Sequence, residues 1–215
     1  MAASSTSQTG LETCLKHERR TGALVWARQI SEYTGVAGDF ARTTPAISGN
    51  LLIFGNQGGR FFTGAKVMAV DKNSGDLAWV VQADDHPASF ITQSAVVAGN
   101  TVYVGVSSLE ELYAAVIPGY ELSFRGSMLA LNRKTGAILW RTYMTPDGFT
   151  GNAVWGSAPA IDHSRSQLYI ATGNTYSAPQ EFLDCILAAG DDEDAQLACL
   201  ARKSHREKTL GVANS

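Results

Sequence analysis

The fold is decided by the stretch SMLALNRKTGAILW, Ser127–Trp140. It reads as an apolar strand, a polar turn and a second apolar strand that ends in tryptophan. Gly136 lies in the turn, where the backbone needs a positive φ that glycine adopts without steric cost. The stretch therefore predicts a β-hairpin.

The same hairpin pattern occurs twice more. Lys66–Trp79 reads KVMAVDKNSGDLAW and repeats the whole unit, whereas Arg19–Trp26, RRTGALVW, repeats its turn and second strand. The preceding segment LETCLKHE, Leu11–Glu18, has helical rather than strand character, so we expect the first copy to lack its first strand. Three such copies predict a repeat architecture.

Strand-turn-strand segments alternate with these copies: TPAISGNLLIFGN (Thr44–Asn56), QSAVVAGNTVYVGV (Gln93–Val106) and SAPAIDHSRSQLYIATGN (Ser157–Asn174). Two hairpins per period give four-stranded units, which are typical of propeller blades. We predict an all-β fold, an incomplete β-propeller of about 3.5 four-stranded blades. The long insertion Leu109–Phe124 is either functional or a plain surface loop.

Composition excludes several classes of protein. The 215 residues are 45% hydrophobic and 17% charged, as in an ordinary globular chain, and the formal net charge is −3. Binders of nucleic acid usually carry a basic stripe, so we expect no nucleic-acid partner. No stretch approaches the roughly 20 apolar residues of a membrane span. The first residues show no secretory signal, and the sequence assigns no compartment.

Three cysteines, Cys14, Cys185 and Cys199, are too few for a disulfide-dense scaffold. Without a secretory signal we expect free, buried cysteines, as in a reducing compartment. The alternative is that Cys185 and Cys199 pair in an oxidising compartment.

The repeat A-L/V-D/N-x-x-T/S-G-x-x-x-W resembles that of the pyrroloquinoline quinone (PQQ) dehydrogenases, the eight-bladed quinoprotein alcohol dehydrogenases. The resemblance covers about Arg19 to Ala201 and is most specific at GNAVWGSAPAID (Gly151–Asp162) and LYIATGN (Leu168–Asn174). The chain is most similar to the polyvinyl-alcohol-dehydrogenase-like branch. The vicinal cysteine pair that many members of the wider family carry is absent.

The resemblance implies a cofactor site. Trp155 would form a flat floor under PQQ, Arg42 would contact its carboxylate and carbonyl groups, and Thr92 would hydrogen-bond to it. These residue types suit the cofactor, because a planar tricarboxylate favours an aromatic surface for stacking and an arginine for charge-assisted hydrogen bonds.

The resemblance also implies a calcium site. Asn174 and Glu110, with Glu111 as an alternative to Glu110, are the expected ligands. Calcium is a hard cation that prefers such oxygen ligands and would polarise the quinone carbonyl as a Lewis acid. The competing structural interpretation is that Trp155 fills the core, Asn174 closes a turn and Glu110 is solvated.

The implied function is oxidation of a small or polymeric alcohol by hydride transfer to PQQ with calcium assistance. The family's catalytic aspartate, the general base, is assigned to no residue of this chain. Two alternatives are a non-catalytic scaffold, because bacterial outer-membrane assembly lipoproteins carry the same repeats without a cofactor, and an inactive fragment.

The expected organisation has four parts. Residues 1–18 are helical or disordered, 19–180 form the partial propeller, 181–201 a cysteine-bearing loop or short helix, and 202–215 a basic, disordered tail. We expect about half of a ring, which cannot close. Its open strand edges predict self-association.

Overall fold

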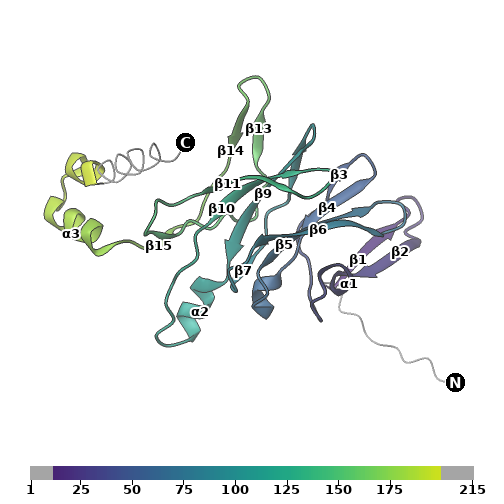
Figure 1. The fold of residues 1–215 in the computed structure, drawn as a ribbon, viewed down its shortest axis with the longest axis horizontal. Helices are drawn as coiled ribbons and strands as arrows, with labels where there is room; N and C mark the ends of the chain where they lie inside the picture. The colour runs from purple at the N-terminus through teal and green to yellow at the C-terminus, as the bar shows by residue number, and fades with distance from the viewer. Residues whose placement is uncertain (1–11, 200–215) are drawn as a thin grey trace.

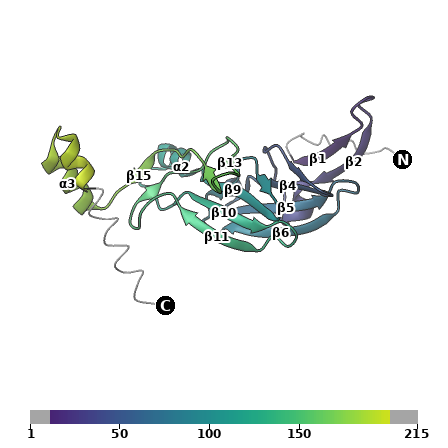
Figure 2. The ribbon, with the colours of Figure 1, turned by 90° about the horizontal axis from the view of Figure 1, so that it is seen from above.

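The computed structural model describes residues 12–199 of the chain. Its strands pair into antiparallel sheets that lie in a row (Figures 1 and 2). The predicted all-β fold, an incomplete propeller with four-stranded blades, is confirmed. The predictions for residues 1–11 and for the basic tail lie outside the described residues.

One complete blade has the strand order β3-β4-β5-β6. Its strands are β3 (Ala46–Ser48), β4 (Leu51–Gly55), β5 (Ala65–Asp71) and β6 (Leu77–Asp84). A short 3₁₀ helix, η1 (Gly58–Phe61), connects β4 to β5.

The next blade has the order β8-β9-β10-β11. Its strands are β8 (Val96–Ala98), β9 (Thr101–Ser108), β10 (Ser127–Asn132) and β11 (Ile138–Tyr143). A two-residue strand, β7 (Ser89–Phe90), pairs with the end of β9. The insertion between β9 and β10 contains the helix α2 (Glu110–Val116).

A hairpin of β1 (Thr13–His17) and β2 (Leu24–Gln29) precedes these blades, and α1 (Ile30–Thr34) follows it. The expectation of helical character over Leu11–Glu18 is wrong for Thr13–His17. Lys16 pairs with Trp26 in the register that pairs Ala69 with Trp79. The partner strand β2 supplies the hydrogen bonds, so tertiary pairing overrides local propensity.

The last described strands form half a blade. The hairpin of β13 (Ala160–Asp162) and β14 (Gln167–Tyr169) is followed by β15 (Thr175–Ser177), which pairs with β12 (Thr150–Gly151). The helix α3 (Gln180–Ala189) then lies apart from the sheets in both views (Figures 1 and 2).

Close packing between consecutive blades depends on glycines in β4 and β9. A Cβ built on Gly55 would lie 2.3 Å from Ile91, and one on Gly105 would lie 2.2 Å from Val154. Both apolar partners are fully buried. A larger residue at either glycine would force neighbouring blades apart.

The repeated tryptophans dock each blade on the turn of the next. Trp26 Nε1 donates to the Lys72 carbonyl (3.3 Å), and a Cβ on Gly75 would lie 3.0 Å from the indole. Both the tryptophan and the glycine are buried. At this junction the repeated tryptophan therefore packs one blade against the next.

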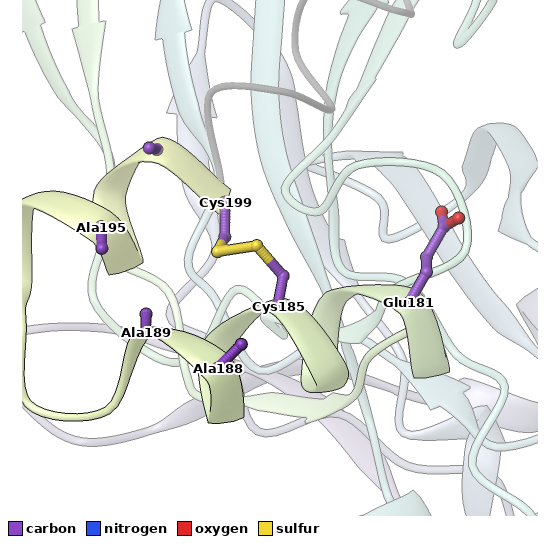
Figure 3. A pocket seen from close by; sticks show the side chains of 7 residues that line it. Glu181, Cys185, Ala188, Ala189, Ala195 and Cys199 are labelled. Atoms are coloured by element: carbon purple, nitrogen blue, oxygen red, sulfur yellow. A yellow bond between two sulfur atoms is a disulfide. The ribbon is translucent and has the colours of Figure 1, made fainter.

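Cys185 and Cys199 form a disulfide, so the expectation of free cysteines is wrong for this pair, and Cys14 is free. The bond joins α3 to residues 193–199, which are also helical (Figure 3). A shallow cleft of about 430 Å³ between them is lined mainly by alanine methyl groups. Within residues 12–199, no helix is long and apolar enough to cross a membrane.

Candidate functional site

Two of the expected cofactor residues occupy equivalent positions in consecutive blades. Arg42 and Thr92 stand at the same spacing before the turns Gly49-Asn50 and Gly99-Asn100. Each turn connects the first two strands of its four-stranded blade. The side chains therefore leave the backbone at the same point of two neighbouring blades.

The third residue, Trp155, continues this series into the half-blade. Thr92 follows Ile91, and Trp155 follows Val154. The backbone N–H groups of Ile91 and Val154 each donate to a carbonyl of the preceding blade, over 2.9 and 3.0 Å. Arg42, Thr92 and Trp155 thus form a succession of three residues, one per blade, which we call the cofactor row.

A buried hydroxyl connects two members of the row. Thr92 Oγ1 lies 3.1 Å from Ser107 Oγ, and Ser107 Oγ donates to the Val154 carbonyl. Since Ser107 gives its proton to that carbonyl, Thr92 is the donor in the other contact. Ser107 is fully buried, so it holds Thr92 close to the backbone that carries Trp155.

Trp155 presents an accessible ring. Its side chain is 36% exposed, and Phe90 meets it edge-on with ring centroids 5.7 Å apart. A Cβ on Gly173 would lie 2.9 Å from Trp155 Nε1, so this glycine leaves the space that the indole occupies. A supported and partly exposed indole can stack on a planar molecule.

Arg42 is exposed and follows α1 in the loop that leads to β3. Among residues 12–199 its guanidinium has no side-chain partner. Its neighbour Thr43 is fixed, because Thr43 Oγ1 accepts a hydrogen bond from the Gly55 N–H over 3.4 Å. An arginine on an anchored backbone with free donors can bind a carboxylate in bidentate geometry.

Glu110, the first residue of α2, is fully buried and surrounded by donors. Its carboxylate accepts hydrogen bonds from the Ser123 N–H (3.0 Å) and hydroxyl (3.1 Å), the Phe124 N–H (2.8 Å) and the Tyr120 hydroxyl (3.3 Å). His86 Nε2 lies 3.2 Å away. A carboxylate has about four lone-pair sites, so these donors saturate it.

The hydrogen bonds also determine the charge of Glu110. Burial acts to raise its pKa, but hydrogen bonds from His86, Phe124 and Ser123 outweigh burial, and the pKa is lowered. His86 Nδ1 accepts the Ala88 N–H over 3.2 Å, which leaves Nε2 as the protonated, donating nitrogen. Glu110 is therefore an ionised anchor for the loop that ends at Phe124.

Asn174, the other expected calcium ligand, follows Gly173 and is exposed. Its backbone carbonyl accepts the Asn152 N–H over 2.7 Å, so its main chain closes the turn into β15. Within residues 12–199, no group of three or more His, Cys, Asp or Glu side chains is placed to hold a metal ion.

As arranged, these residues do not fit a calcium ion. The ion could bind Glu110 only by displacing hydrogen bonds from Ser123, Tyr120 or His86, and calcium needs six to eight oxygen ligands. The alternative ligand Glu111 is exposed on α2. The metal-binding roles of Glu110, Glu111 and Asn174 stay predictions.

Sequence reasoning missed the groups that position the site. Ser107 and His86 carry no motif, and their roles depend on contacts with residues far away in the chain. Tyr176 was missed as well. Its hydroxyl is buried and has no hydrogen-bond partner among residues 12–199. Burial, followed by the charges of Glu111 and Glu110, raises its pKa.

The chain matches a family known from its sequence repeats. The sequence model of the PQQ_2 family, described as outer membrane protein assembly factor BamB, matches residues 4–182. That range contains every member of the cofactor row and all of the strands that the structure describes within residues 12–199.

Two curated relatives share the resemblance. A polyvinylalcohol dehydrogenase of Sphingopyxis sp. (strain 113P3) is 30% identical over 193 residues, which are 82% of this chain and 28% of the relative. A polyvinylalcohol dehydrogenase of Pseudomonas sp. is 32% identical over 136 residues, 56% of this chain and 21% of that protein. The chain thus spans about a quarter of the length of these relatives.

Solved structures share the fold. A quinohemoprotein alcohol dehydrogenase from Pseudomonas putida HK5 superposes with a TM-score of 0.58 at 23% identity, covering 78% of this chain and 26% of the other. One from Comamonas testosteroni gives a TM-score of 0.57 at 19% identity, with 79% and 27% coverage.

Proposed function

The chain belongs to the PQQ_2 repeat family, and from this premise we propose that its blades form part of the PQQ-binding face of an alcohol dehydrogenase. Both curated relatives are polyvinylalcohol dehydrogenases. The substrate class that we propose is therefore an alcohol, small or polymeric. Because the chain spans about a quarter of those relatives, oxidation by the whole protein is part of the proposal.

The observation that carries the proposal is the cofactor row. Arg42, Thr92 and Trp155 stand at one position of successive blades, and we propose that one flat molecule contacts all three. Their chemistry is complementary to a planar polycarboxylate, with an accessible indole at one end and a free guanidinium at the other.

Bound PQQ would supply the two-electron acceptor that alcohol oxidation needs. The protein's own groups orient it. Trp155 stacks on its ring, with Phe90 and Gly173 holding the indole in place. Arg42 neutralises carboxylate charge. Thr92 gives its proton to Ser107, so it donates to the cofactor only by leaving that contact.

No step is assigned to calcium, because Glu110 is saturated by protein donors in this arrangement. No residue of the chain is assigned as the general base that removes the proton of the alcohol. The residues of the cofactor row bind and orient, and they do not transfer the proton.

Titration of the protein with PQQ tests the proposal, with bound cofactor measured by equilibrium dialysis. Trp155→Ala should weaken binding by about 1–3 kcal/mol, which is about 5- to 150-fold, because one stacking contact is lost. The matched control is Trp140→Ala, which removes another exposed indole, 42% exposed, outside the row.

Equal affinity for PQQ in wild type and Trp155→Ala would remove the stacking assignment. Absence of saturable PQQ binding would favour the alternative function, a non-catalytic scaffold. The description of the matched family, an outer-membrane assembly factor, makes that the second candidate.

A further inference from the structure

Two contacts of the same design join consecutive blades. Trp26 covers Gly75, and Trp79 covers Gly136 with its Nε1 donating to the carbonyl of Arg133 over 3.0 Å. Both tryptophans are only 7% exposed. Each contact pairs the tryptophan of one blade with the glycine turn of the next.

The third tryptophan and the first turn of this repeat lack such a partner. Trp140 is 42% exposed, and among residues 12–199 its Nε1 has no hydrogen-bond acceptor. Gly22 is exposed, and no described atom lies within 4 Å of a Cβ built on it, whereas Gly75 and Gly136 are buried. One half of the contact is therefore open at each end of the row of blades.

The open turn already has the conformation of the covered ones. Gly22 has a φ of +71°, compared with +78° at Gly75 and +74° at Gly136. The Gly22 N–H donates to the Glu18 carbonyl over 2.8 Å, the distance found in the other two turns. A preformed turn loses little conformational freedom when it binds.

The strands at the two ends are complementary too. In a complete blade, a first hairpin such as β3-β4 pairs through its second strand with a second hairpin such as β5-β6. The β13-β14 hairpin corresponds to a first hairpin, but the elements that follow it are β15 and α3 and not a second hairpin. The β1-β2 hairpin is a second hairpin. Among residues 12–199, the outer edges of β14 and β1 are unpaired.

A cleft lies where the missing turn would sit. Its volume is about 350 Å³, and Trp140, Ser166 and Gln167 are among the residues that line it. In the complete blade, the Lys72 carbonyl accepts a hydrogen bond from Trp26 Nε1. The Lys72 N–H donates to the Asn50 carbonyl in the turn after β3. The glycine turn thus fills the space between a tryptophan and the first hairpin, which is the position of this cleft.

We propose that the chain binds a second copy of itself head to tail. The turn Arg19–Gly22 of one copy enters the cleft beside Trp140 of the other, and β1 of the first copy pairs with β14 of the second. The strands β13, β14, β1 and β2 then make one complete blade from two chains. The main-chain hydrogen bonds of the added strand provide the affinity.

The complete blades specify the register of this pairing. In a complete blade, the residue after the turn of the first hairpin pairs with the residue that begins the turn of the second hairpin. Leu51 and Asp71 form this pair in the β3-β4-β5-β6 blade. The same rule places Gln167 opposite Glu18. It also brings the exposed Arg19 to the turn that follows Asp162, the last residue of β13. Hydrogen bonds from Ser164 and Arg165 lower the pKa of Asp162 to about 2 and keep it charged.

This contact uses different surfaces on the two copies. A heterologous contact of this kind closes into a ring if the rotation between copies permits it, and otherwise extends into a filament. In the ring and in the filament alike, the cofactor row lies within a single chain. The inference therefore does not depend on PQQ binding.

Sedimentation velocity across a protein concentration series tests the proposal. Wild type should show assemblies larger than a monomer. Trp140→Ala should raise the dissociation constant at least about tenfold, since a buried tryptophan is commonly a dominant contact. Gly22→Ala should do the same, because its methyl group would meet the incoming indole. Trp155→Ala, which changes an indole outside the interface, should associate like wild type.

A second control separates turn strain from contact. Gly119 has a φ of +75° and no described atom within 4 Å of a Cβ, so Gly119→Ala carries the same backbone strain in the loop before β10. It should associate like wild type. Circular dichroism of each variant establishes that it is folded.

Mixing the two defective variants gives the sharpest result. Trp140→Ala retains an intact turn and Gly22→Ala retains an intact tryptophan, so an equimolar mixture should form a 1:1 dimer that does not grow further. A monomeric wild type, association unchanged in both variants, or a mixture that fails to form the dimer would each overturn the proposal.

Discussion

Trp79 covers Gly136 so closely that a Cβ built on the glycine would lie 2.6 Å from the indole. Two features make glycine necessary at position 136. Its φ of +74° is unfavourable for other residues, and the indole of the preceding blade leaves no space for a side chain. One residue thus connects the local geometry of a turn to the packing of one blade on another.

Gly136→Ala should destabilise the protein by about 2–5 kcal/mol, since left-handed backbone costs about 1–2 kcal/mol and the overpacked contact adds about 1–3. Gly75→Ala should cost less, because its Cβ would lie 3.0 Å from Trp26. Gly119→Ala, with backbone strain alone, should cost least. Urea unfolding measures all three, and equal losses would show that the tryptophan contact adds nothing.

Glu110→Gln should destabilise the protein by about 2–3 kcal/mol at pH 7, because hydrogen bonds to a charged acceptor are the strong ones. Since folding lowers the pKa of Glu110, its contribution is complete above the unfolded pKa of about 4.3. It is lost as the pH falls through the folded pKa. The difference in unfolding free energy between wild type and variant should therefore shrink as the pH falls below the unfolded pKa of about 4.3. A difference that is independent of pH would contradict the role of the charge.

Calcium alone should leave the midpoint of thermal unfolding unchanged, because binding at Glu110 requires displacement of existing hydrogen bonds. Magnesium is the control for general ionic effects. A rise specific to calcium that disappears in Asn174→Ala would show that Ser123 and Tyr120 release the carboxylate, and would support the calcium site implied by the resemblance.

Arg42→Gln should weaken PQQ binding about 10- to 150-fold, the equivalent of about 1.5–3 kcal/mol for hydrogen bonds to a charged group. Arg60→Gln removes the same charge from a nearby site, where the guanidinium lies 5.9 Å from the Phe40 ring, and should change affinity little. Equal losses in both variants would indicate general charge attraction rather than a specific contact.

Alkylation of the non-reduced, denatured protein should modify one cysteine, Cys14, because Cys185 and Cys199 are joined. In the native protein the reaction at pH 8 should be slow, since burial raises the pKa of Cys14 to about 11 and leaves little thiolate. Mass spectrometry counts the modified residues. Three modified cysteines without reductant would contradict the disulfide.

The sequence by itself determined the repeating hairpins. A glycine with positive φ between two apolar strands specifies a turn through interactions within a few residues. Gly75 and Gly136 both do so, independently of the blade in which they lie. The alternation of two hairpin types then determined four-stranded blades. These features depend on local backbone geometry, which is why a single sequence predicts them.

Only the tertiary structure decided which partners the remaining residues have. Thr13–His17 became a strand because β2 pairs with it, although its sequence had helical character. Glu110 became a saturated anchor because Ser123 and Phe124 fold back onto it. Trp79 is buried and Trp140 is exposed, although both end the same motif, because a glycine turn covers only the first. Each outcome depends on contact with another segment of the chain, which the pattern of a single segment does not encode.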